Sequence, residues 1–329
     1  MKLLFGIVAC LLTSCTRPSA ITLQRTQQVL TIEAPALYPE TIVYDEQRQA
    51  FLVSSLRRGA IYQVDRDGRA RTVVEDPRLC SVLGFAVDRR AGRLWVVNSD
   101  LGASVRPSAV GSKQLAAVGV YDLATGKALR YLDLSSLAPG PHLLNGIALD
   151  AQGNAYVTDS FTPVIYRIDA SGAVSVFLRA AAFAGDGINL NGVVVHPNGY
   201  LLVVKKSDGS LFKVPLLEPA RFSRVLNSSA LRGGDGVVLL SEESLVIVAN
   251  RTPQTATNAA MVLTSGDDWD TARLGSKVEF GDVYPTTAAL RDGSLYVVYS
   301  KLNALIQSTP EEQRLLEQRA TIERLSLGR

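Results

Sequence analysis

The sequence is poor in several residue types, and each shortage narrows the range of functions. Its 329 residues include only three cysteines and two histidines, so a zinc site made of thiolates and imidazoles is disfavoured. Lysine and arginine (34) barely exceed aspartate and glutamate (31), and no basic run stands out. Nucleic acid is therefore not expected as a partner. The apolar run Leu3–Leu12 is too short to span a bilayer as a helix.

The N-terminal segment is typical of an export signal. Lys2 supplies a positive charge, Leu3–Leu12 supplies the apolar stretch, and small residues follow. The four residues Leu-Thr-Ser-Cys that end at Cys15 resemble a bacterial lipobox, in which this cysteine is lipidated and becomes the new N-terminus. The alternative is a simple secreted protein that is cut near Ala20.

The export signal sets the expected domain boundaries. Residues 1–20 are expected to be signal and linker, and residues 21–329 to form one folded domain. We expect an exported protein, either a lipoprotein of the outer membrane or periplasm or a secreted one, and the lipid on Cys15 would be its link to a membrane. Cys80 is then the one cysteine left, so no intramolecular disulfide is expected.

One pattern recurs six times along the chain: a short apolar strand, a tight turn containing glycine, and a second apolar strand. We name the residue at the start of each copy the axis position. Successive axis positions are 43 to 62 residues apart, and a repeat of 40 to 50 residues with short strands is typical of a β-propeller. The six axis positions are Glu40, Leu83, Asn145, Asn191, Asp235 and Thr286.

Each of the first five repeats contains four runs rich in Val, Leu, Ile and Tyr, which predicts four strands per repeat. The sixth supplies only three, and Thr26–Glu33 near the N-terminus is a ready donor for the fourth. Pairing the two ends of the chain would remove the open edges of the terminal sheets. The prediction is an all-β, six-bladed β-propeller closed by an N-terminal strand.

The long connections are predicted to lie on one face. Strand polarity brings Asp100–Ala116, Arg251–Asn258 and Lys301–Arg319 to the same face as the axis positions, whereas the turns on the other face are minimal. Pro310–Gln318 is expected to form a short helix, because proline starts it and acidic residues follow in the first turn. We expect these loops to shape the binding pocket.

Four axis positions carry carboxylate or amide oxygens, and such oxygens are the ligands that Ca²⁺ prefers. Two carboxylates about 5 Å apart repel by about 3 kcal/mol at an effective dielectric constant near 20, so a counter-charge is expected. An alternative stays open, because Asn-Gly and Asp-Gly are common turn dipeptides. Glu40 lies in no turn signature, which favours a divalent metal: Ca²⁺, or Mg²⁺, Mn²⁺ or Zn²⁺.

Other polar residues are candidates on the same face. His142, in the loop before Asn145, could act as a base or hold a substrate, and a solvated loop histidine fits the sequence equally well. Asp186 and Asn189 lie on another such loop and are candidate substrate contacts. Four residues end second strands and could line the pocket: Asp100, Asp159, Lys205 and Asn250.

Four axis positions resemble the gluconolactonase/senescence-marker-protein (regucalcin) family, which is related to the paraoxonase and strictosidine synthase propellers: Glu40, preceded by Pro39, and Asn145, Asn191 and Asp235, each followed by glycine. The resemblance implies that Glu40, Asn191 and Asp235 bind a divalent metal, often Ca²⁺, and that Asn145 contacts metal or substrate. It also implies that Asp235 activates water while the metal polarises a lactone carbonyl, with His142 as the rival base.

The sequence departs from the family at two places. Sugar lactonases of the family carry arginine two residues before the third-blade asparagine, and Leu143 stands there in this chain. Leu83 makes the second axis position apolar. A polyhydroxylated sugar lactone is therefore not favoured, and a more apolar lactone or ester fits better.

These observations lead to one expected function and two alternatives. We expect a metal-dependent hydrolase of a lactone or ester in the cell envelope, with a small-molecule substrate and no obligate protein partner evident. The first alternative is a non-catalytic, metal-stabilised binding propeller. The second is a condensing enzyme similar to strictosidine synthase, for which no amine-binding acid is apparent.

Overall fold

A computed structural model describes residues 21–226, 231–315 and 318–328. The predicted signal, linker and lipidated Cys15 lie outside the described residues, so export and lipidation remain predictions. In the described part of the chain, no helix is long and apolar enough to cross a membrane.

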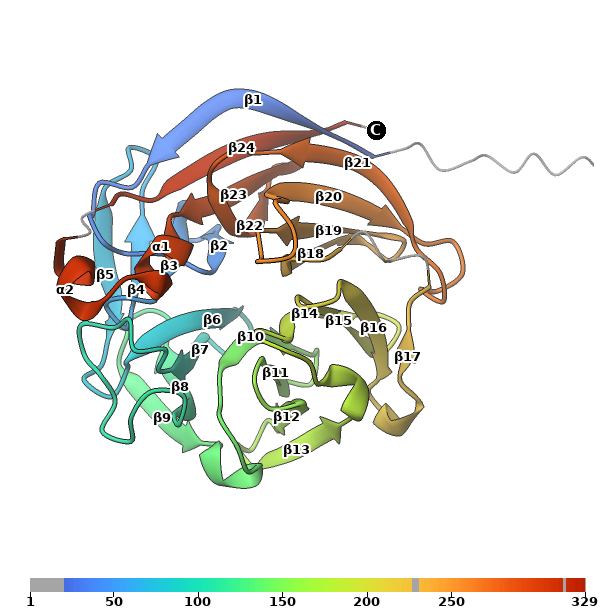
Figure 1. The fold of residues 1–329 in the computed structure, drawn as a ribbon, viewed down its shortest axis with the longest axis horizontal. Helices are drawn as coiled ribbons and strands as arrows, with labels where there is room; N and C mark the ends of the chain where they lie inside the picture. The colour runs from blue at the N-terminus through green and yellow to red at the C-terminus, as the bar shows by residue number, and fades with distance from the viewer. Residues whose placement is uncertain (1–20, 227–230, 316–317, 329) are drawn as a thin grey trace, which may run out of the picture.

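The described strands form six antiparallel sheets of four strands each, arranged around a central axis (Figure 1). The predicted six-bladed propeller is therefore confirmed. From the axis outward, blade 1 consists of β2 (Ile42–Asp45), β3 (Ala50–Ser55), β4 (Ala60–Val64) and β5 (Ala70–Glu75). Blade 2 consists of β6 (Ser81–Asp88), β7 (Arg93–Ser99), β8 (Ala116–Asp122) and β9 (Ala128–Asp133). Blade 3 consists of β10 (Leu144–Leu149), β11 (Ala155–Asp159), β12 (Val164–Ile168) and β13 (Val174–Arg179).

The other three blades follow the same plan. Blade 4 consists of β14 (Leu190–His196), β15 (Tyr200–Lys205), β16 (Ser210–Pro215) and β17 (Ser223–Arg224). Blade 5 consists of β18 (Gly234–Ser241), β19 (Ser244–Ala249), β20 (Ala259–Thr264) and β21 (Arg273–Glu279). Blade 6 consists of β22 (Tyr284–Arg291), β23 (Ser294–Ser300), β24 (Thr321–Gly328) and β1 (Thr22–Thr31).

The N-terminal strand closes the ring, as the repeat count predicts. β1 pairs antiparallel with β24, with Leu23 opposite Leu327, and the two strands lie side by side at the rim in Figure 1. The strand begins four residues earlier than predicted. Leu23, which lies in this extra stretch, is 5% exposed and packs with Val246 and Leu325 in the core between blades 5 and 6. Burial of that side chain stabilises the longer strand.

Apolar side chains between neighbouring blades form the core. One cluster joins blades 2 and 3 through Val97, Val118, Val157 and Tyr166, all fully buried. Similar clusters lie between the other blades. The β-branched and aromatic residues that predicted strands thus also fill the spaces between the sheets.

The glycines after the axis positions bring neighbouring blades close together. Asn145, Asn191 and Asp235 lie within strands, and the glycines that follow them have no positive φ, so these dipeptides do not form turns here. A methyl group added at Gly192 would lie 2.3 Å from the backbone oxygen of Asp235 in the next blade. At Gly146 the corresponding distance to the oxygen of Asn191 is 2.5 Å. Glycine is therefore required for close approach near the axis.

Two short helices follow β23. Helix α2 (Pro310–Leu315) begins where predicted, and the end of the predicted helix includes residues 316–317, which lie outside the described residues. Thr309 and Glu312 exchange hydrogen bonds in a capping box at its start. Helix α1 (Leu302–Gln307) was not predicted. Three single 3₁₀ turns occupy Ser135–Leu137, Ala181–Phe183 and Pro219–Arg221.

Candidate functional site

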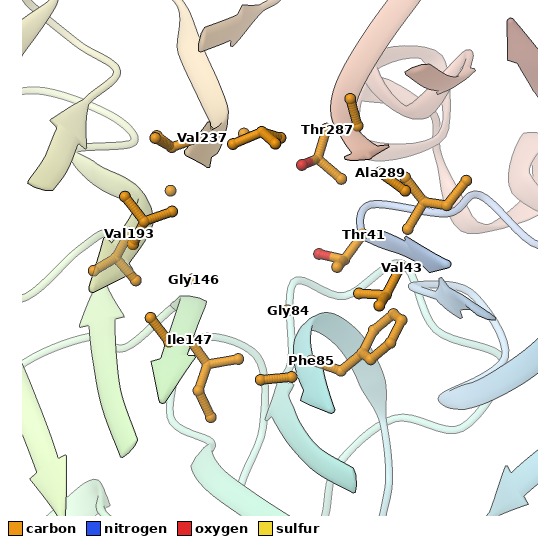
Figure 2. A pocket seen from close by; sticks show the side chains of 18 of the residues that line it. Thr41, Val43, Gly84, Phe85, Gly146, Ile147, Val193, Val237, Thr287 and Ala289 are labelled. Carbon is orange, nitrogen blue, oxygen red and sulfur yellow. The ribbon is translucent and has the colours of Figure 1, made fainter. Parts of the chain in front are cut away.

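A cavity of about 480 Å³ follows the propeller axis and is lined by all six innermost strands. Figure 2 shows its wall: Val43, Phe85, Ile147 and Val237 present carbon, and the hydroxyls of Thr41 and Thr287 are the labelled polar groups. The labelled side chains are therefore mostly apolar, although polar atoms, including backbone groups, make up about half of the lining surface.

The two ends of the cavity differ in exposure. At one end, its lining includes Glu46, Arg89 and Leu290, all exposed to solvent. At the other end, the lining includes Glu40, Asn145, Asn191 and Asp235, which are between 2% and 7% exposed. The structure thus brings the four predicted ligand residues to one cavity, at its closed end.

An apolar cluster adjoins this closed end, and we name it the apolar cap. Its members come from segments at or just before four axis positions, from helix α1, and from the connections that contain Leu56 and Ala103. They include Tyr38, Leu83, Leu143, Tyr284, Leu302 and Leu305. No described residue of the three long loops lines the central cavity. Two of these loops instead contribute to the cap at its closed end, one through Ala103 and one through α1.

Lys206 contacts the polar side chains at the closed end of the cavity through Asp235, and it was not predicted from the sequence. Its ammonium nitrogen is 2.9 Å from Oδ2 of Asp235, and its side chain is 5% exposed. It also donates to the side-chain oxygen of Asn250 and lies 3.5 Å from the hydroxyl of Tyr284. Burial alone would lower the pKa of Lys206, but Asp235 and Tyr284 raise it above its ordinary value. The side chain is therefore an ammonium at neutral pH.

Glu40 is the second carboxyl group at the closed end. Burial, and then the negative charge of Asp235, raises the pKa of Glu40 to about 8. Thr41 donates a hydrogen bond of 2.8 Å to Oε2 of Glu40. At neutral pH this carboxyl carries a proton, so Lys206 and Asp235 together leave the group without net charge. We name Glu40, Asn145, Asn191, Lys206 and Asp235 the axis cluster.

The amide side chains complete the axis cluster. Nδ2 of Asn145 donates to Oγ of Ser160 at 3.1 Å, which leaves its Oδ1 as an acceptor. Asn191 is 2% exposed, and its backbone oxygen accepts a 2.6 Å hydrogen bond from Thr158. These hydroxyls fix the third and fourth axis positions against the second strand of blade 3.

With Lys206 in this position, the axis cluster does not fit a divalent cation. The ammonium and the side-chain amide of Asn250 both donate to Oδ2 of Asp235, so that oxygen is already engaged. A divalent ion would also lie beside a fixed positive charge. In the described residues, no group of three His, Cys, Asp or Glu side chains is arranged to hold a metal. The counter-charge expected from the sequence is supplied by a lysine.

His142 lies apart from the cavity lining. Its Nδ1 is 2.7 Å from Oδ2 of Asp159, and its Nε2 is 3.2 Å from the backbone oxygen of Ser135. The bond to Asp159 raises the pKa of His142, and the side chain is 2% exposed. Both ring nitrogens thus have partners within blade 3 and its flanking loop. This geometry favours a structural role for His142.

The other predicted substrate contacts also lie outside the cavity lining. Asp186 is exposed to solvent. Asn189 is buried, but its amide donates to the backbone oxygens of Gly185 and Gly187, and its oxygen accepts from Ser207. Asn189 thus holds its own loop in shape.

Of the residues predicted at the ends of second strands, one reaches the axis cluster. Asn250 contacts Asp235 and Lys206, whereas Asp100 accepts hydrogen bonds within its own loop. Lys205 is directed away, with its ammonium 2.6 Å from the backbone oxygen of Ala184. Lys205 was predicted from the sequence, whereas the next residue, Lys206, reaches the axis cluster, because successive side chains at a strand end face opposite ways.

Comparison with known proteins supports the fold. No model of a protein family matches the sequence, and no curated protein matches it. Among solved structures, the Mala s 1 allergen of Malassezia sympodialis aligns with a TM-score of 0.70 at 18% identity, covering 91% of this chain and 96% of its own. A luciferin-regenerating enzyme aligns with a TM-score of 0.61 at 13% identity, covering 91% and 95%.

A protein named as a candidate gluconolactonase also aligns, with a TM-score of 0.56 at 14% identity, covering 95% of each chain. Because all these identities are below one fifth, the similarities show a shared propeller architecture.

Proposed function

We propose that this protein is a hydrolase of a lactone or another carboxylic ester that binds in the central cavity. One observation carries the proposal: buried proton donors and acceptors are gathered at the closed end of a cavity whose side walls carry several large apolar side chains. Buried groups of this kind, with a strongly shifted pKa, are typical of catalytic sites.

The axis cluster has the groups that ester hydrolysis requires. Negative charge builds on the carbonyl oxygen as water attacks, and the Lys206 ammonium or an asparagine amide can donate hydrogen bonds to it. The attacking water must lose a proton, and Asp235, or Glu40 in the fraction of molecules in which it is ionised, can accept it. Because the pKa of Glu40 is raised to about 8, this carboxyl can exchange protons near neutral pH.

The walls indicate the class of substrate. Val43, Phe85, Ile147 and Val237 surround a cavity of about 480 Å³, and Leu143 belongs to the apolar cap. These surfaces favour an ester with an apolar body and few hydroxyl groups. A ligand that reaches the axis cluster through the open end would pass along this wall.

Purified protein assayed against a panel of aliphatic lactones and aryl esters tests the proposal. We expect turnover, with kcat/KM lowered by at least about 100-fold in Asp235→Asn and in Lys206→Met. Glu46→Gln, at the open end of the cavity, is the matched control and should retain activity. No turnover on any member of the panel, or turnover that is indifferent to both substitutions in the cluster, would refute the proposal.

The metal remains a prediction from the sequence. The residues predicted to hold it are Glu40, Asn145, Asn191 and Asp235, and such a metal would have to share Asp235 with Lys206. Repeating the assay with a chelator and with added Ca²⁺ separates a metal-dependent enzyme from a metal-independent one.

A non-catalytic binding propeller is the second candidate. It is favoured by the hydrogen bonds of Asp235, whose Oδ2 receives both Lys206 and Asn250, since a satisfied buried network also serves to stiffen a fold. If the protein only binds its ligand, apolar esters should raise its melting temperature without being cleaved. Thermal shift and product analysis on the same panel distinguish the two functions.

A further inference from the structure

Lys206 is held in place by its backbone as well as by its side chain. It follows directly after β15, and its backbone nitrogen donates to the oxygen of Asn189 at 2.9 Å. Its backbone oxygen accepts from the nitrogen of Gly233, also at 2.9 Å. Blades 4 and 5 and the loop before β14 therefore fix the backbone position of Lys206. Its side chain is 5% exposed and extends to Asp235 at the axis.

The contacts of the ammonium are those that a cation at the axis would have. It meets the carboxylate of Asp235 at 2.9 Å and the side-chain oxygen of Asn250. It also lies 5.4 Å from the centre of the Tyr284 ring, within range of a cation–π contact. These partners come from blades 5 and 6, so the lysine joins three blades.

The neighbouring lysine provides an internal comparison. Lys205 is as well buried, with a side chain 6% exposed, but its ammonium binds the backbone oxygens of Ala182 and Ala184 and the carboxylate of Asp208. These partners belong to the outer part of blade 4 and the loop before it. The pair thus offers one lysine at the axis and one away from it, with the same charge and similar burial.

We propose that Lys206 is the resident cation of the axis cluster and excludes a divalent metal from it. A metal bound by Asp235 would lie beside the Lys206 ammonium, and Oδ2 of that carboxylate is already engaged by Lys206 and Asn250. Without the lysine, two carboxyl groups and two amides around one cavity remain, which is a donor set suited to Ca²⁺. The proposal concerns the same cluster as the proposed function but does not depend on whether any ester is cleaved.

Calorimetric titration of chelator-treated protein with Ca²⁺ tests this proposal. Wild type and Lys205→Met should bind Ca²⁺ no more tightly than about 1 mM, and Lys206→Met should bind it at least about 100-fold more tightly. Methionine keeps an unbranched stem of similar length and removes the charge. Tight binding of Ca²⁺ by the wild type would overturn the proposal, and so would the absence of a new site in Lys206→Met.

A second measurement covers the case in which Lys206→Met is unstable, since it leaves Asp235 buried without its partner. Ca²⁺ should then raise the melting temperature of this variant and leave that of Lys205→Met unchanged. In the wild type, the NMR signal of Lys206 after ¹³C-methylation, assigned with Lys206→Arg, should not move on addition of Ca²⁺. Displacement of that signal by Ca²⁺ would show that the metal takes the site from the lysine and would contradict the proposal.

Discussion

Glu40 should make the stability of the fold depend on pH, and Glu40→Gln should remove that dependence. In the folded protein, burial and the charge of Asp235 hold the pKa of Glu40 near 8, compared with an ordinary value of 4.5. Between these two values the folded state keeps a proton that the unfolded chain releases. The free energy of unfolding must therefore fall as pH rises through this interval.

The size of the effect follows from the shift. Each pH unit in the interval costs the wild type about 1.4 kcal/mol, and the whole shift corresponds to about 5 kcal/mol. Glutamine has nearly the same shape and stays neutral, so the variant should lack this slope. The difference in stability between wild type and variant should thus change by about 4 kcal/mol between pH 5 and pH 8.

Urea denaturation at several pH values, with a chelator present, measures the two curves. Glu46→Gln is the control, because Glu46 is exposed at the opposite end of the cavity, and its curve should parallel that of the wild type. Parallel curves for Glu40→Gln and wild type would refute the assignment of a protonated carboxyl at the axis.

Three further predictions follow from the packing. Gly192→Ala should destabilise the protein by about 1 to 3 kcal/mol in urea denaturation, because the new methyl group meets the backbone of the next blade. Gly266→Ala is the control: nothing lies within 4 Å of its new methyl group, so it should be nearly neutral. Asp159 raises the pKa of His142, so the ion pair should contribute fully to stability below about pH 6.5 and lose that contribution as pH rises through the pKa of the folded state. NMR titration of the ring, compared with denaturation of His142→Ala, checks this. An unshifted pKa in that titration would contradict it. Removal of Thr22–Thr31 should leave β24 as an open edge and produce aggregation visible by light scattering, and a monomer as stable as the full chain would refute the role of this strand.

The fold could be predicted because its signal is repeated six times. Period, strand-forming composition and the missing fourth strand of the last repeat all pointed to the same ring, and each independent copy reduced the ambiguity. The extra residues of β1 at Leu23 could not be predicted, since they depend on packing against blades 5 and 6.

The axis cluster was predicted only in part, for physical reasons. Position in the repeat located Glu40, Asn145, Asn191 and Asp235, because equivalent residues of each blade meet at the axis. Lys206 directly follows the second strand of its blade, as Ser160 and Asn250 do in blades 3 and 5. The sequence Lys-Lys at the end of β15 does not show which of the two lysines holds this position. One residue of register decided that question.

The partners of polar side chains were the least accessible feature. Asp159 and His142 are 17 residues apart and meet at 2.7 Å, and nothing in either segment alone distinguishes a buried ion pair from two free groups. The short distances between blades likewise appear in the sequence only as glycine, a residue that turns also use.

The contacts at Gly84, Gly146 and Gly192 have a consequence for how specificity can change. At these places the main chains of neighbouring blades are in contact. The spacing of the blades around the central cavity is therefore set by the backbone and not by the side chains that line the cavity. Residues such as Val43 or Ile147 can then be exchanged to suit another ligand while the polar groups at the far end keep their mutual positions.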